Sequence, residues 1–158
     1  MSTERKFLDM YWDGRLPVDP WMIAERSGVR VIPDGSLAWG QDPLSGKFEK
    51  ENNIPTIRFN PNESRVRQRF TIAHELGHCA LGHGLAYRDP ATNFSARTYN
   101  PDEIAANRFA ASLLMPADMI EATIMDLRDP SVESLAELFG VSQVAMEFRL
   151  KNLGWLRG

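Results

Sequence analysis

The sequence holds very little cysteine and histidine: one cysteine, Cys79, and three histidines in 158 residues. A single cysteine excludes an internal disulfide and a zinc finger built on pairs of cysteines. No apolar run approaches the length of a membrane-spanning helix, and the start, MSTERKF, lacks the apolar stretch of a signal peptide. The formal net charge of -3 gives the molecule no general attraction to nucleic acid or to an anionic membrane. We therefore expect a cytoplasmic protein with no membrane partner.

The composition is that of an ordinary globular protein. Hydrophobic residues make up 43% of the chain and charged residues 25%, and both fractions are typical of a folded domain rather than of a disordered segment. A chain of this length can bury a core without disulfides. We therefore expect one domain over residues 1–158.

Four dipeptides mark expected helix starts, because Asp or Asn followed by proline is a favourable N-cap and first helical position. They are Asp19-Pro20, Asn60-Pro61, Asn100-Pro101 and Asp129-Pro130. Together with the spacing of apolar residues, they predict helices over about 20–28, 61–82, 101–114, 117–127, 130–139 and 143–153.

Short β-branched runs between turn residues predict three or four antiparallel strands ahead of the long helix. The candidates are VRVI (29–32), SLAWG (36–40), GKFEK (46–50) and IPTIRFN (54–60). The predicted fold class is α+β, with a small N-terminal antiparallel sheet packed on a mostly helical core. Along the chain we expect a helix and the sheet over about 18–60, a long helix over about 61–83, a loop over 84–99 and a helical part over 100–158.

All three histidines fall within RFTIAHELGHCALGH, residues 69–83. His74 and His78 are four residues apart, so on a helix their rings project from one face about one turn apart and can bind the same metal ion. Glu75 follows the first histidine and is placed to take a proton from water activated by that metal. This H-E-x-x-H pattern is typical of zinc hydrolases, with two metal ligands and a general base.

An amphipathic helix whose histidines fall at the edge of the core is the simpler alternative. The flanking residues are largely apolar, which predicts that much of this helix is buried. Two histidines and a glutamate would cost several kcal/mol there if they had no partner, on the order of the penalty for buried polar groups, and a metal ion satisfies all three. We therefore favour a metal site.

A catalytic zinc ion needs a third protein ligand. His83 is one candidate, but the longer H-x-x-G-x-x-H pattern needs a glycine at position 81 and a histidine at position 84, where this chain has Leu81 and Gly84. His83 also suits the end of the helix, or a contact to a ligand or substrate. Glu103, in NPDEIAANRFAASLLMP, is the other candidate, although its place three residues after Asn100 also suits capping of its own helix. Spacing alone leaves both roles of Glu103 open.

The two motifs together, RFTIAHELGHCALGH and the ExxANRFAASLLMP of residues 103–116, resemble the ImmA/IrrE family of metallo-endopeptidases. The resemblance continues from about residue 17 to 31, through 57–62, and over 135–154. It implies a gluzincin-like zinc site in which His74, His78 and Glu103 hold Zn²⁺ and Glu75 is catalytic. Ala105 stands where a variant of the family has a further glutamate, which argues against a second carboxylate in the site.

The resemblance also implies a function: site-specific cleavage of a helix-turn-helix (Xre-like) transcriptional repressor encoded nearby. In this family such cleavage relieves repression in a phage, mobile-element, DNA-damage or anti-phage defence response. The loop over 84–99 supplies candidate oxyanion donors in Tyr87, Arg88, Arg97 and Tyr99, none of which the sequence singles out. SLAWG is a candidate edge strand for binding the substrate backbone.

Two features favour other functions. The segment 135–154, LAELFGVSQVAMEFRLKNLG, has the helix, Gly-Val-Ser turn and helix pattern of a DNA-binding helix-turn-helix. Its second helix is rich in apolar residues, so we expect a structural hairpin. Arginines lie close together near the start of the long helix, at positions 58, 65, 67 and 69. They make single-stranded DNA a weak candidate for an activator. The simpler alternative is a solvated face whose arginines pair with nearby acidic residues. The alternative to a protease is therefore a non-cleaving regulatory module that binds a repressor or DNA.

Overall fold

The structure is a computed structural model that describes residues 1–83, 88–90 and 100–157. The elements in chain order are α1 (Thr3–Tyr11), α2 (Pro20–Arg26), β1 (Arg30–Pro33), the 3-10 helix η1 (Gly35–Ala38), β2 (Leu44–Glu51), β3 (Ile54–Phe59), α3 (Arg65–Ala80), β4 (Arg88–Pro90), α4 (Pro101–Leu114), α5 (Ala117–Leu127), α6 (Val132–Phe139) and α7 (Gln143–Asn152). The predicted α+β class is confirmed.

Two of the four predicted helix starts are correct. Asp19 caps α2 by accepting from the backbone N–H of Met22, and Asn100 caps α4 by accepting from that of Asp102. In each case proline occupies the first helical position, where its missing N–H costs nothing.

The other two predicted starts are wrong by a few residues. Ser64 caps α3, four residues after Asn60, and Ser131 caps α6, two residues after Asp129. The Asn60 side chain instead binds the carbonyl of Leu44 and the N–H of Asn62, which forms a turn after β3. Asp129 has a positive φ of 61°, a left-handed conformation that a right-handed helix cannot include.

The sheet has four strands in the order β1-β3-β2-β4. It is mixed rather than wholly antiparallel as predicted, because β1 pairs with β3 in parallel while β2 is antiparallel to both β3 and β4. β2 does not pair with β1. The β2–β3 hairpin instead places β3 between β1 and β2.

SLAWG does not form the predicted strand. Residues 35–38 form η1, which Asp34 caps by accepting from the backbone N–H of Ser36. This segment is the crossing between β1 and β2, and as a 3-10 turn it offers no strand edge to a peptide. The predicted binding of a substrate backbone to SLAWG is therefore wrong.

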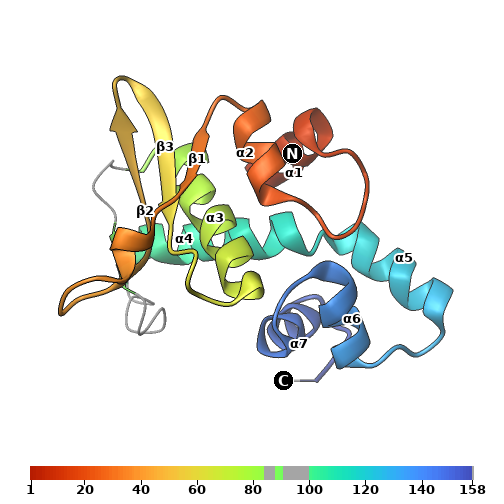
Figure 1. Cartoon of the computed structure of the whole chain (residues 1–158). Helices are drawn as coiled ribbons and strands as arrows, with labels where there is room; N and C mark the ends of the chain where they lie inside the picture. Colours follow the sequence, from red (N-terminus) through yellow and green to blue (C-terminus); the bar gives the residue numbers. More distant parts are fainter. Residues whose placement is uncertain (84–87, 91–99, 158) are drawn as a thin grey trace.

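α3 is the central element: it packs against β2 and β3 on one side and against α4 on the other. Figure 1 shows the sheet at one end of α4 and the C-terminal helices α5, α6 and α7 at the other end. Buried residues of α3, such as Ile72 and Leu76, belong to the same hydrophobic cluster as Phe109 and Leu113 of α4. Within the described residues, no helix is both long and apolar enough to cross a bilayer.

The arginines near the start of α3 have separate structural roles. Arg58 forms ion pairs with Glu51 and Asp34 on the sheet. Arg69 is half-buried, and its guanidinium donates to the carbonyls of Val18, Phe139 and Gly140. These two arginines thus stabilise the packing of the chain rather than forming a common surface with the others.

Candidate metal centre

α3 and α4 approach each other closely at one glycine. A Cβ atom on Gly77 would lie 3.2 Å from both the Cα atom and the carbonyl oxygen of Ala106, and 3.1 Å from the ring of Phe109. The absence of a side chain at Gly77 therefore lets the two helix backbones lie nearly in contact. This contact sets the distance between the histidines of α3 and the first turns of α4.

His74, His78 and Glu103 converge between these two helices. The two Nε2 atoms are 3.2 Å apart. Glu103 places Oε2 3.2 Å from His74 Nε2 and Oε1 2.9 Å from His78 Nε2. All three side chains are almost fully buried, at 0% to 1% exposed. The arrangement is thus a compact group of two imidazole nitrogens and one carboxylate in the core.

The separations of these atoms fit a tetrahedral metal ion. Zinc–nitrogen and zinc–oxygen bonds of about 2.0–2.2 Å at tetrahedral angles require ligand atoms about 3.3–3.5 Å apart. The three distances in the structure lie within a few tenths of an ångström of that range. A His-His-Glu set is also a recognised donor set for catalytic zinc. His74, His78 and Glu103 can therefore hold a divalent metal without rearrangement of the helices.

The electrostatics favour the protonation states that a metal needs. Burial alone would raise the pKa of Glu103, but hydrogen bonds from His74 and His78 outweigh it and hold that pKa well below its ordinary value. Burial lowers the pKa of His78 and outweighs the opposing hydrogen bond from Glu103. An ionised carboxylate and a neutral imidazole are the forms that bind metals.

His83 lies beside this group without belonging to it. Its Nδ1 is 2.8 Å from Nδ1 of His78, and its Nε2 is 3.4 Å from Oδ1 of Asp102. The metal-binding group found among the described residues contains His74, His78 and Glu103 alone. Of the roles left open by the sequence, the structure thus places His83 in contact with His78. The link from His83 to Asp102 gave no sequence signal, because the two residues lie on different sides of the loop.

Glu75 points toward the sheet. A Cβ atom on Gly46 of β2 would lie 3.5 Å from Cγ of Glu75 and would clash with the Thr71 side chain, so Gly46 provides the space for this face of α3. Glu75 is fully buried. Among residues 1–83, 88–90 and 100–157, neither of its carboxylate oxygens has a hydrogen-bond partner. Gly46 was not anticipated, although a glycine inside a strand is itself a signal of close approach.

One of the four candidate oxyanion donors lies among the described residues. Arg88 lies in β4, opposite Lys47 of β2. Tyr87, Arg97 and Tyr99 lie outside the described residues. Phe70, one turn before the histidines, stacks on the ring of His74 with centroids 6.2 Å apart.

Comparison with known proteins gives one family. Residues 24–151 match the model of the IrrE N-terminal-like domain of peptidase family M78. The chain is 34% identical over 110 residues to the radiation response metalloprotease IrrE of Deinococcus radiodurans, an alignment that covers 68% of this chain and 33% of that protein. It is 30% identical over 110 residues to the metallopeptidase ImmA of Bacillus subtilis, covering 70% of this chain and 64% of that protein. The chain thus spans less than two thirds of the length of either relative.

A solved structure shares the fold. A transcriptional regulator of Mycobacterium tuberculosis superposes with a TM-score of 0.63 at 18% sequence identity, over 94% of this chain and 45% of that one. At this identity the likeness concerns the fold alone. The family model, by contrast, covers most of the chain and includes both metal-binding helices. The chain therefore contains an IrrE N-terminal-like domain and belongs to the ImmA/IrrE family of metallopeptidases.

Proposed function

We propose that this protein is a zinc-dependent endopeptidase. The observation that carries the proposal is the convergence of His74, His78 and Glu103 on one buried point, next to the Glu75 carboxylate, which has no hydrogen-bond partner among the described residues. A buried carboxylate without hydrogen bonds destabilises the fold, and a general base for hydrolysis is a reason to retain one. The relatives named as metallopeptidases in two bacteria support the same activity.

Each residue has a defined part in peptide hydrolysis. His74, His78 and Glu103 would hold the ion, while the His83 side chain orients the ring of His78 through its hydrogen bond. When bound, zinc supplies Lewis-acid chemistry, since it polarises the peptide carbonyl and lowers the pKa of water. Glu75 accepts the proton of the attacking water and returns it to the leaving amine nitrogen. In the part of the chain that the structure describes, no donor competes for the Glu75 oxygens, and this suits the exchange.

We propose a helix-turn-helix repressor encoded nearby as the substrate. The two sequence motifs support this proposal through the resemblance to the ImmA/IrrE family, whose members act on such repressors. Cleavage would relieve repression in a phage, mobile-element, DNA-damage or anti-phage defence response. A repressor acts on DNA in the cytoplasm, which is where the reaction would take place. The separate roles of Arg58 and Arg69 give no support to a single-stranded DNA activator.

Co-expression with the repressor encoded beside the gene tests this function. We expect the repressor to be cleaved by the wild type and to remain intact with Glu75→Ala, while both proteins bind one equivalent of zinc. Metal content is measured on the purified proteins, and cleavage by mass spectrometry of the repressor. Inactivation of the repressor that persists unchanged with Glu75→Ala would instead favour the alternative, a regulatory module that binds a repressor or DNA without cutting it.

A further inference from the structure

α3 ends in a turn that folds the chain back onto His78. Gly82 follows the helix with a φ of 73°, a left-handed conformation that a residue without a Cβ atom adopts at no steric cost. The backbone N–H of Gly82 donates to the carbonyl of Cys79 at 3.2 Å, and that of His83 donates to the carbonyl of His78 at 2.9 Å. These two bonds form the Schellman motif of a helix C-terminus, which brings the first and last side chains of the turn together.

The two side chains that meet in this turn are both imidazoles, where apolar pairs are common. The ring centroids of His78 and His83 are 5.1 Å apart, and their Nδ1 atoms are 2.8 Å apart. Two ring nitrogens at this distance form a hydrogen bond only if one bears a hydrogen and the other a lone pair. The turn therefore couples the tautomer of His83 to the tautomer of His78.

Asp102 lies at the other nitrogen of the His83 ring, with Oδ1 3.4 Å from Nε2. A carboxylate oxygen repels a lone pair and attracts an N–H, because it can only accept. With the hydrogen of His83 on Nε2, its Nδ1 accepts and Nδ1 of His78 must donate. Nε2 of His78 then keeps the lone pair that a metal ion binds. Asp102 therefore favours the tautomer of His78 that suits a metal ligand.

Glu103 favours the opposite direction of this hydrogen bond while no metal is bound. Its Oε1 atom is 2.9 Å from Nε2 of His78, so it attracts a hydrogen to the nitrogen that a metal needs. His83 would then donate from Nδ1 to His78, and the lone pair of His83 Nε2 would face Asp102. The two carboxylates thus compete for the direction of one chain of hydrogen bonds, and Asp102 favours the direction in which His78 is ready to bind a metal.

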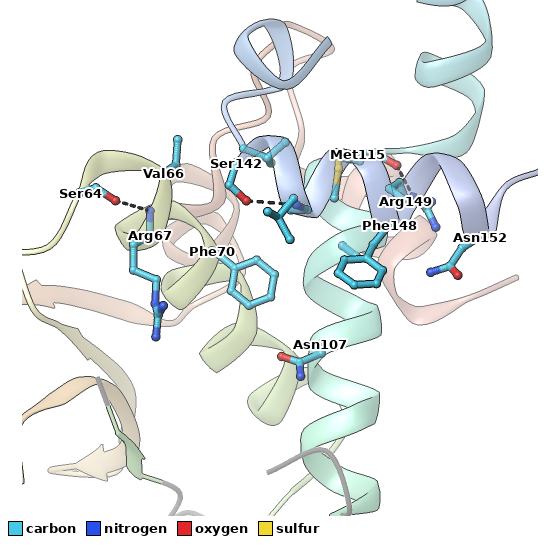
Figure 2. Close-up of a pocket in the computed structure, with 14 residues that line it drawn as sticks. Ser64, Val66, Arg67, Phe70, Asn107, Met115, Ser142, Phe148, Arg149 and Asn152 are labelled. Carbon is cyan, nitrogen blue, oxygen red and sulfur yellow. Dashed lines mark hydrogen bonds between the residues drawn. The ribbon is translucent and has the colours of Figure 1, made fainter. Parts of the chain in front are cut away.

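The polar chain from His78 through His83 to Asp102 is distinct from the contacts of the other proposed histidine ligand. His74 stacks on Phe70, which lines a cavity of about 630 Å³ between α3, α4 and α7 (Figure 2). Neither His83 nor Asp102 lines that cavity. The chain instead runs from the end of α3 to the first turn of α4, so it links the two helices that carry the proposed ligands.

We propose that Asp102 is a positioning residue of the metal centre, which acts through His83 to keep the hydrogen of His78 on Nδ1. The donations run from His78 Nδ1–H to His83 Nδ1, and from His83 Nε2–H toward Asp102 Oδ1. They select the tautomer of His78 whose Nε2 atom can bind a metal, and so raise metal affinity. Because Asp102 precedes Glu103 on α4, the helix that supplies the third ligand also fixes the tautomer of the second. The inference rests on the proposed function, since it assumes that these residues hold zinc.

Nitrogen NMR of the histidine rings tests this role without an activity assay. The chain has three histidines, so ¹⁵N-histidine labelling of the full chain gives three ring systems, and a ring nitrogen that bears a hydrogen is resolved from one with a lone pair. In the zinc-loaded wild type we expect the hydrogen of His83 on Nε2 and that of His78 on Nδ1. In the metal-free chain, Asp102→Ala should raise the share of His83 rings with the hydrogen on Nδ1.

Zinc affinity, measured by competition with a chelator, should fall about 10-fold in Asp102→Ala, at the low end of the effect of an outer partner of a metal ligand. Glu133→Ala is the matched control, since Glu133 is an exposed acidic residue in the first turn of α6 and likewise interacts favourably with the dipole of its helix. It should change neither the tautomer nor the affinity. Melting curves verify that both variants fold.

The outcomes separate this role from the proposed function. If the wild type binds zinc but Asp102→Ala leaves the His83 tautomer or the affinity unchanged, or Glu133→Ala lowers the affinity equally, the role of Asp102 is refuted and the proposed endopeptidase is untouched. Failure of the wild type to bind zinc would count against both. A shifted tautomer together with weaker zinc binding, in Asp102→Ala alone, supports the proposal.

Discussion

Gly77 of α3 lies directly against Ala106 of α4, so that a Cβ atom on Gly77 would be 3.2 Å from the Ala106 backbone. Glu103 is one turn from Ala106, and His78 follows Gly77. The contact between these two small residues therefore fixes the distance between the proposed metal ligands of the two helices.

Enlarging Gly77 should damage both stability and the metal centre. We expect Gly77→Val to lower the free energy of unfolding by about 1–3 kcal/mol, because overpacking forces the helices apart. Zinc affinity should fall in the same variant, because Glu103 moves away from the histidines. Thermal melting and zinc titration measure the two effects. Gly35→Val is the control, since a Cβ atom there meets nothing within 4 Å; equal losses in the two variants would contradict this role of Gly77.

The ligand assignment predicts an order of metal affinities. Glu103→Ala removes a ligand, whereas His83→Ala removes only the partner of His78. Loss of such an outer partner weakens metal binding about 10- to 100-fold, and loss of Glu103 should weaken it further. Zinc content and competition with a chelator measure both variants, with Glu121→Ala on the exposed face of α5 as the control. A larger loss with His83→Ala would refute the assignment of Glu103.

The parts of the site that the sequence predicts well are local ones. His74, Glu75 and His78 lie on one turn and a half of a helix, so their spacing alone fixes their mutual arrangement. Glu103 is separated from them by a loop, and its position depends on how α4 packs against α3. Spacing therefore left its role open, and the family resemblance rather than geometry favoured it.

In the fold, too, elements set by local sequence are predicted well, whereas pairings set by distant parts of the chain are not. α4 and α5 have the predicted bounds, because caps and apolar spacing agree there. The parallel pairing of β1 with β3 depends on where the chain crosses, which no local pattern specifies. α1 was missed, although Ser2 caps it and Phe7 packs on Tyr11 one turn later, because Leu8 is its only fully buried residue and its apolar face is short.

Arg69 should be a major stabilising residue of the C-terminal hairpin. Its guanidinium donates to Val18 O at 2.6 Å, Gly140 O at 3.0 Å and Phe139 O at 3.3 Å. We expect Arg69→Met to cost about 2–4 kcal/mol of unfolding free energy, because buried carbonyls lose charged donors. Denaturant unfolding measures this cost. Arg65→Met, at an exposed position one turn earlier, should be nearly neutral, and a cost as large as that of Arg69→Met would show that the buried hydrogen bonds are not its cause.

The ion pairs of Arg58 should make part of the stability depend on pH. The hydrogen bond from Arg58 is the main reason that the pKa of Glu51 lies below its ordinary value; Ser36 first and Arg58 second lower the pKa of Asp34. Carboxylates whose pKa is lower in the folded state stabilise it above their unfolded pKa of about 4, and this contribution disappears as the pH falls through the folded value.

Arg58→Met should therefore lower the melting temperature at neutral pH, and its difference from the wild type should shrink as the pH is lowered from about 5 to 3. Both proteins carry the same proposed metal centre, so the acid sensitivity of that centre cancels in the difference. Lys151→Met, which breaks an exposed pair with Glu147 on α7, should have little effect at any pH. A difference for Arg58→Met that stays constant over this range would mean that Arg58 stabilises the sheet through packing of its aliphatic stem rather than through its charge.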